Sequence, residues 1–267
     1  MSRNSTPRLW RTLALAGAAA GVAAGTHAKS FQGFVKADEA KLWLAQSKGG
    51  EGGEGGEGGE GGEGGAPEDA SDGAAFLIEL GKLEAHIQAA MRLWYAGYQD
   101  DAVALAAHPE AEFMGELREK LTERGVEDVT PKIDALIDAL AGDDGQAVEA
   151  AFDVALADIR VAGTGIEAHE RFEAVLHLVR DAAEEYEHAF ENELVWDTIA
   201  LEEARGFLDA AGVLVGPLDG EPGETVTAQI ERAKAAFPGA STAEFKPDPS
   251  ILHGVAARIE IVANRVK

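Results

Sequence analysis

Cysteine is absent from all 267 residues, so the chain has no disulfide, no thiolate metal site, no thiol nucleophile and no lipid-anchored cysteine. Positive charge is scarce, since 23 Lys and Arg against 48 Asp and Glu give a formal net charge of −25 at pH 7. This surplus repels phosphate and anionic lipid and attracts cations, which argues against a nucleic-acid partner. Aromatic residues are only 6 %, but 46 % of residues are apolar, which excludes wholesale disorder.

Catalytic signatures are also missing. The chain has no GxSxG elbow, no P-loop, no HExxH and no glycine fingerprint between a strand and a helix. Carboxylate pairs are too frequent in so acidic a sequence to single out an active site. We therefore expect a binding protein and not an enzyme.

The first 28 residues have the three parts of a secretory signal peptide. Arg3, Arg8 and Arg11 form a basic start, residues 13–24 read LALAGAAAGVAA, and small residues precede a cut after Ala28. The apolar run is shorter than the roughly 20 residues that span a bilayer, and no later segment is long and apolar enough to do so. The sequence predicts export to the periplasm or beyond, with an uncleaved anchor as the alternative.

Residues 48–71 form a linker dominated by a GGE repeat. Glycine and evenly spaced like charges favour an extended, flexible tether. A short arm, residues 29–47, precedes it and carries several apolar side chains, including Trp43. We expect the folded domain to occupy residues 72–267.

From Asp72 onward the apolar spacing is almost entirely helical. Asp72 is expected to cap the first helix and Gly97 to end it. The expected helices cover 72–96, 99–107, 109–125, 130–142, 143–162, 167–192, 197–211, 224–237 and 250–264. A strand pattern occurs only at 212–216, and residues 218–223 are the expected hinge. The fold class is therefore all-α, an antiparallel helical bundle, in which the last two helices pack on the body or form a separate lobe.

Without cysteine, metal binding requires imidazole and carboxylate ligands, which suit iron, copper or zinc. His86 lies on the flank of the apolar stripe of its helix, where it can be half-buried and face a neighbour. That neighbour offers His108 and, one turn later, Glu112. The two segments can bring these three residues together as a metal site; alternatively, His108 only ends a helix beside Pro109 and His86 packs at an edge.

A second candidate set lies on the expected helix 167–192. His169, Glu173 and His177 recur at four-residue spacing and continue through Asp181. This stripe points away from the apolar face of its own helix. It is either a solvated polar face or, if another helix covers it, a metal site.

Two stretches resemble proteins of bacterial metal uptake. Val175–Gly212 has a leucine-rich helix, a tyrosine, a short turn with a valine, and a second helix with an acidic residue and a phenylalanine. These places are filled by Tyr186, Val195, Glu202 or Glu203, and Phe207. The order resembles the helical periplasmic region that accompanies bacterial high-affinity iron permeases. Leu80–Phe113 resembles exported helical proteins broadly similar to imelysin-type metal-uptake lipoproteins, and the two stretches cover about a third of the chain.

The sequence departs from both patterns at defined positions. Asn192 or Glu193 stands where a turn glycine is expected, and the imelysin GxHxxE frame keeps only His188 and Glu191, with Tyr186 in place of the glycine. The resemblance implies a periplasmic helical accessory of metal uptake, but it does not transfer an iron site.

Two functions are consistent with the sequence. The first is binding or delivery of a metal ion, iron above all, with a membrane metal permease or another envelope protein as partner. The second is a protein-interaction module in which the tethered arm docks a partner through Trp43.

Overall fold

The computed structural model describes residues 65–238 and 245–266, all within one compact unit, Ala37–Lys267. The predicted signal peptide (1–28), the arm (29–47) and the GGE repeat lie outside the described residues. The last residues of the predicted linker are described and contact the folded domain. Ala66 and Ala70 pack against the core, and the Ser71 hydroxyl donates to a Glu173 carboxylate oxygen at 2.8 Å.

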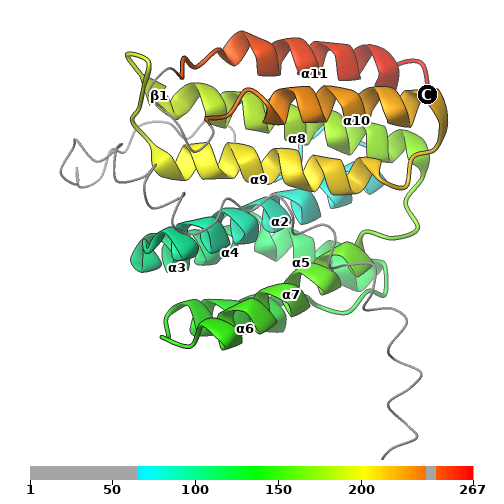
Figure 1. The fold of residues 1–267 in the computed structure, drawn as a ribbon. Coiled ribbons are helices and arrows are strands. Elements are labelled where there is room, and N and C mark those ends of the chain that lie inside the picture. The colour runs from blue at the N-terminus through cyan, green and yellow to red at the C-terminus, as the bar shows by residue number, and fades with distance from the viewer. Residues whose placement is uncertain (1–64, 239–244, 267) are drawn as a thin grey trace, which may run out of the picture. The chain divides into compact units, whose positions relative to one another are not determined.

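The described residues are mostly helical, which confirms the all-α class (Figure 1). In chain order the elements are α2 (Asp72–Ala96), α3 (Gln99–Ala107), α4 (Pro109–Glu112), α5 (Met114–Glu123), α6 (Thr130–Leu140), α7 (Gly145–Ala162), α8 (Ala168–His188), β1 (Phe190–Glu191), β2 (Leu194–Val195), α9 (Thr198–Val215), α10 (Gly220–Lys234) and α11 (Pro249–Ala263). Among these described helices, none is both long and apolar enough to cross a membrane.

Most expected helix ends are confirmed. Gly97 ends α2 in the left-handed conformation, with φ 90°, which glycine adopts without the steric cost of a Cβ. Pro109 separates α3 from α4, and Asp197 caps α9 by accepting from two backbone N–H groups. At the start of α2 the capping position is Ser71, and Asp72 is the first helical residue.

Several expected elements differ, among them the helix predicted over 224–237, which is α10 and covers Gly220–Lys234. The predicted helix 109–125 is interrupted at Phe113, whose backbone has φ −138°. The predicted helix 167–192 ends at His188, because the chain turns into the β1–β2 hairpin with positive φ at Asn192 and Glu193. Residues 212–216 are not a strand, since α9 continues to Val215.

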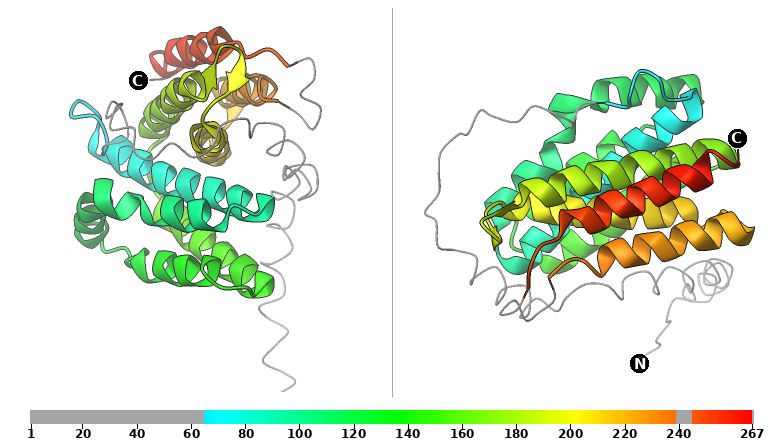
Figure 2. Two further views of the ribbon diagram at one scale, coloured as in Figure 1. Left: turned by 90° about the vertical axis from the view of Figure 1, so that its left-hand side faces the viewer. Right: turned by 90° about the horizontal axis from the view of Figure 1, so that it is seen from above.

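Helix α2 is central in this unit. It packs against α8 and α9 on one side and against α3, α5 and α7 on the other (Figures 1 and 2). Two glycines permit close contacts there. A Cβ on Gly81 would collide with the Leu178 side chain of α8, and a Cβ on Gly206 would collide with the backbone of Ala85.

The last two helices pack on the rest of the bundle and do not form a separate lobe. Helix α11 lies against α8, and α10 lies against α9 and α11. The Tyr186 hydroxyl of α8 donates to the Ala236 carbonyl just after α10 at 2.8 Å. Most of the expected hinge 218–223 belongs to the first turn of α10.

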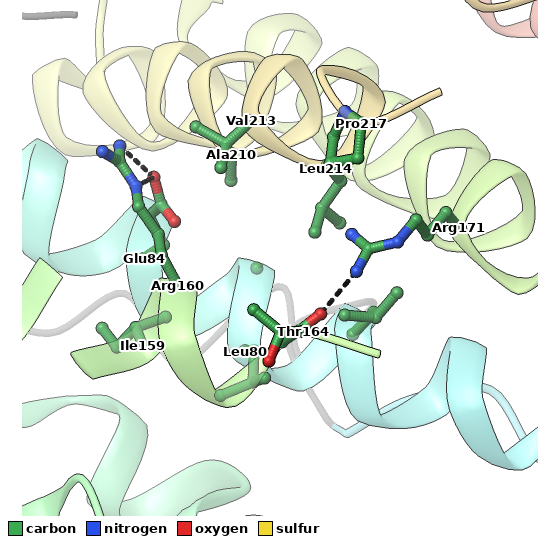
Figure 3. Close-up of a pocket in the computed structure, with 13 residues that line it drawn as sticks. Leu80, Glu84, Ile159, Arg160, Thr164, Arg171, Ala210, Val213, Leu214 and Pro217 are labelled. Atoms are coloured by element: carbon green, nitrogen blue, oxygen red, sulfur yellow. Dashed lines mark hydrogen bonds and ion pairs between the residues drawn. The ribbon is translucent and has the colours of Figure 1, made fainter. Parts of the chain in front are cut away.

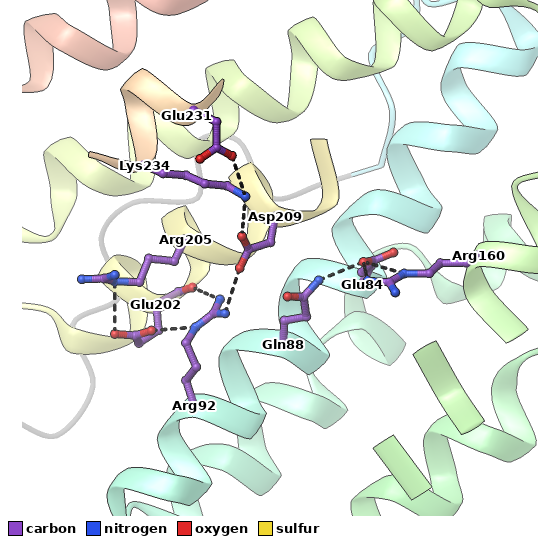
Figure 4. Close-up of polar contacts among 9 residues, drawn as sticks. All are labelled: Glu84, Gln88, Arg92, Arg160, Glu202, Arg205, Asp209, Glu231 and Lys234. Atoms are coloured by element: carbon purple, nitrogen blue, oxygen red, sulfur yellow. Dashed lines mark hydrogen bonds and ion pairs between the residues drawn. The ribbon is translucent and has the colours of Figure 1, made fainter. Parts of the chain in front are cut away.

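Ion pairs connect α2, α9 and α10 (Figure 4). Arg92 of α2 contacts Glu202 at 2.8 Å and Asp209 at 3.1 Å, both on α9, and Lys234 of α10 reaches Asp209 at 2.8 Å. Burial opposes ionisation of Asp209, but Arg92 and Lys234 outweigh it and lower the pKa of this carboxyl group. Asp209 thus contacts a cation on each of two neighbouring helices, and Arg92 contacts two carboxylates of α9. These ion pairs orient α9 against α2.

Candidate metal centre

His86 lies in the middle of α2, and its side chain is only 1 % exposed. This burial is more complete than its flank position predicts, because Phe113 and Phe207 cover the ring from other segments, with ring centroids 6.1 and 6.3 Å away. His86 Nδ1 lies 2.8 Å from the Lys82 carbonyl oxygen. Since a carbonyl only accepts, this contact assigns the proton of neutral His86 to Nδ1 and the lone pair to Nε2.

His108 and Glu112 approach His86 from the segment that joins α3 to α4. The proline after His108 stops α3, and one turn later Glu112 is the last residue of α4. His108 Nε2 lies 3.1 Å from Glu112 Oε1, and the two imidazole ring centroids lie 5.8 Å apart. His108 is 42 % exposed and Glu112 is 16 % exposed, so solvent reaches the group from this side.

The structure brings His86, His108 and Glu112 together. Each offers one ligand atom, and these atoms lie within 4.8 Å of one another; no other group of three His, Cys, Asp or Glu in residues 65–238 and 245–266 meets the same condition. Two ligand atoms bound at about 2.1 Å from one metal ion lie about 3.0–3.5 Å apart. A pair of ligand atoms at the outer limit of this spacing would therefore have to move together by about 1.3–1.8 Å around an ion.

Glu203 of α9 contacts His86 from outside this group of three, and the spacing around His86 and His108 did not reveal it. Its Oε1 lies 3.3 Å from His86 Nε2, and its side chain is 5 % exposed. The only signal in the sequence was the acidic position of the iron-permease resemblance, filled by Glu202 or Glu203. The structure distinguishes these two glutamates by their contacts. Glu203 contacts His86, whereas Glu202 forms ion pairs with Arg92 and Arg205 (Figure 4).

Glu79 lies two turns before His86 on α2 and is fully buried. Desolvation raises its pKa, although Lys120 of α5 hydrogen-bonds and pairs with it and opposes the shift. This carboxylate is engaged with Lys120 and contributes no atom to the group of ligands.

The second candidate set, on α8, is not brought together. His169 is exposed, whereas Glu173 accepts from the backbone N–H and the hydroxyl of Ser71. His177 is half-buried, and desolvation lowers its pKa. Farther along the stripe, Asp181 faces α2 and lies 3.6 Å from Lys82 Nζ. Glu173 thus contacts Ser71 and Asp181 contacts Lys82, so the residues of the stripe do not share one partner.

A hollow between α2, α7 and α9 offers no alternative metal site (Figure 3). Its lining is mostly apolar, and its acidic residue, Glu84, is held by Arg160 at 2.7 Å. Arg171 reaches into the hollow and donates to the Gly163 carbonyl oxygen at 2.6 Å, so it caps the C-terminal end of α7. The lining contains two cationic side chains and no imidazole, which disfavours a cation there.

Comparison with protein-family models, with curated proteins and with solved structures finds no match to this chain.

Proposed function

We propose that this protein binds a first-row transition-metal ion, iron above all with copper or zinc as alternatives, through His86, His108 and Glu112. The observation that supports the proposal is the convergence of two imidazoles and one carboxylate from separate helices. Imidazole nitrogen and carboxylate oxygen together suit these metals, whereas Mg²⁺ and Ca²⁺ prefer all-oxygen ligands.

The proposal extends to a non-catalytic role in metal uptake at the cell envelope, with the protein periplasmic or secreted. The basic and apolar segments of residues 1–28 support export, and the acidic composition raises the local concentration of cations. A membrane metal permease or another envelope protein would receive the ion from the partly exposed His108 side of the site.

The first prediction is stabilisation by metal. A ligand at 100 times its dissociation constant stabilises the folded state by about 2.7 kcal/mol, which corresponds to a rise of about 5–10 °C in Tm for a domain of this size. We expect this rise with micromolar Zn²⁺, Cu²⁺ or anaerobic Fe²⁺ and not with the same concentration of Mg²⁺. Thermal unfolding followed by circular dichroism, with titration calorimetry for the affinity, measures the effect.

His108→Ala is the informative variant, because this side chain is half-exposed and its loss leaves no cavity in the core. We expect it to abolish the rise in Tm. His169→Ala removes an exposed histidine of α8 and is the matched control, with the rise retained. Equal stabilisation of both variants would show that metal binds elsewhere.

A further inference from the structure

We propose that the hollow between α2, α7 and α9 binds a short-chain monocarboxylate, whose carboxylate contacts the Arg171 guanidinium while its alkyl chain lies between the apolar walls. The hollow shares no residue with the group of His86, His108 and Glu112, so an organic anion there is independent of metal binding.

The charge of Arg171 is the first argument. This residue of α8 is only 9 % exposed, and its side chain points into the hollow (Figure 3). Its Nε donates to the Ile166 carbonyl oxygen at 3.2 Å and its Nη2 to the Gly163 carbonyl oxygen at 2.6 Å, and both acceptors are neutral. Within the described part of the chain no carboxylate forms an ion pair with it, and burial alone lowers the pKa of its guanidinium. Buried cations are ordinarily paired with an anion, whereas carbonyl oxygens at a helix end carry only partial negative charge.

The donors of the guanidinium are the second argument. The contacts with Ile166 and Gly163 use Nε and Nη2, so the N–H groups of Nη1 remain to donate to a ligand. A guanidinium that is held at two nitrogens has a fixed orientation, which suits recognition of a planar carboxylate.

The shape and lining of the hollow are the third argument. Its volume is about 100 Å³, roughly two-thirds of that of an apolar cavity that takes up benzene. Branched aliphatic side chains from three helices form its walls: Leu77 and Leu80 of α2, Ile159 of α7, and Val213 and Leu214 of α9 (Figure 3). An alkyl chain of about three carbon atoms suits this volume. Apolar walls with a few well-placed polar groups are typical of a site for a small organic ligand.

The opposite end of the hollow limits the ligand to one carboxylate. There Arg160 and Glu84 lie 2.7 Å apart, so their charges balance (Figure 3). Of the described residues that line the hollow, only Arg160 and Arg171 are cationic. A dicarboxylate would therefore bury its second charge beside Glu84 without a cation of its own, which is costly. We expect butyrate to bind and succinate, which has the same number of carbon atoms, to bind much more weakly.

Saturation-transfer difference NMR titrations of the full chain with butyrate, acetate and butyramide measure this binding. We expect a dissociation constant of about 1 mM for butyrate, which is within the range that so small a ligand can reach. Acetate lacks two methylene groups, each worth a factor of about four when buried, and should bind roughly fifteenfold more weakly. Butyramide keeps the shape but not the charge, and should lose about tenfold or more.

Two variants locate the ligand. Arg171→Met removes the cation and should lower the affinity for butyrate by about tenfold or more. Because Arg171 also caps α7, a second variant leaves it in place: Val213→Phe fills the hollow from a half-buried position on α9 and should abolish binding. Arg258→Met removes an exposed arginine of α11 and is the matched control, with the affinity retained.

Three results would overturn the proposal. Equal affinities for butyrate and acetate would mean that no alkyl chain is enclosed. Undiminished binding by Val213→Phe would place the anion outside the hollow. The third is the absence of butyrate binding by the unsubstituted protein at roughly 20 times the expected dissociation constant. None of these results bears on the metal site, which is tested with metal ions alone.

Discussion

Gly206→Ala is expected to lower the free energy of unfolding by about 2–3 kcal/mol, near the upper end of what overpacking costs. The new Cβ would meet the carbonyl oxygen and the Cα of Ala85, and backbone atoms cannot swing aside as a long side chain can. The higher helix propensity of alanine returns about 1 kcal/mol at most. Denaturant unfolding followed by circular dichroism measures the change.

Gly212→Ala is a matched control in the same helix. A Cβ at Gly212 has only the flexible Lys234 Nζ near it, at 3.5 Å, so helix propensity decides the outcome. We expect no loss of stability and a gain of up to about 1 kcal/mol. If the two variants were equally stable, the close contact between α2 and α9 would not exist in solution. Gly206→Ala should also weaken metal binding, because the clash falls on the backbone of Ala85, which immediately precedes His86, whereas Gly212→Ala should not.

The second large effect is the pH dependence of stability that Asp181 causes. This residue of α8 faces α2, where its carboxylate lies 3.6 Å from Lys82 Nζ. Desolvation raises its pKa from 3.8 to about 6, although Lys82 opposes the shift; Glu184 adds to it and Arg180 reduces it. Between these two values the folded protein binds more protons at this position than the unfolded chain does. Stability from this group is therefore greatest at low pH and falls as the pH rises from about 4 through about 6.

The size of the effect follows from the shift. A change of about 2 pKa units corresponds to about 3 kcal/mol. We expect the difference in unfolding free energy between the unsubstituted protein and Asp181→Asn to change by about this amount between pH 4 and pH 7, to the disadvantage of the unsubstituted protein. The same replacement at the exposed Asp134 of α6 should show no comparable change with pH. A difference that moved the other way would mean that the pairing with Lys82 outweighs desolvation.

The two effects have different consequences for the proposed site. Gly206 holds α9 against α2 immediately beside His86, so stability and metal affinity should change together there. Asp181 contacts the Lys82 side chain, whereas His86 uses the Lys82 backbone carbonyl. Asp181→Asn should therefore alter stability with little change in metal affinity at pH 7.

The amino-acid sequence by itself determined the features that depend on neighbouring residues. Gly97 ends its helix through a left-handed backbone, and Pro109 stops α3 at His108. The spacing of His108 and Glu112 placed them one helical turn apart, as observed at 3.1 Å. The absence of cysteine and the surplus of carboxylates limited the chemistry to imidazole and carboxylate ligands. These conclusions were accessible because backbone preferences and helical periodicity act over a few residues.

Only the tertiary structure decided which faces meet. Helical periodicity shows which residues share a face, but it does not show which other helix covers that face. His86 therefore looked like a flank residue, although it is buried where α2 meets α9, and the equally regular stripe of His169, Glu173 and His177 is divided among different neighbours. Glu203 joins His86 because glycine at position 206 allows two helix backbones to touch, a contact between segments far apart in the chain that no local preference encodes.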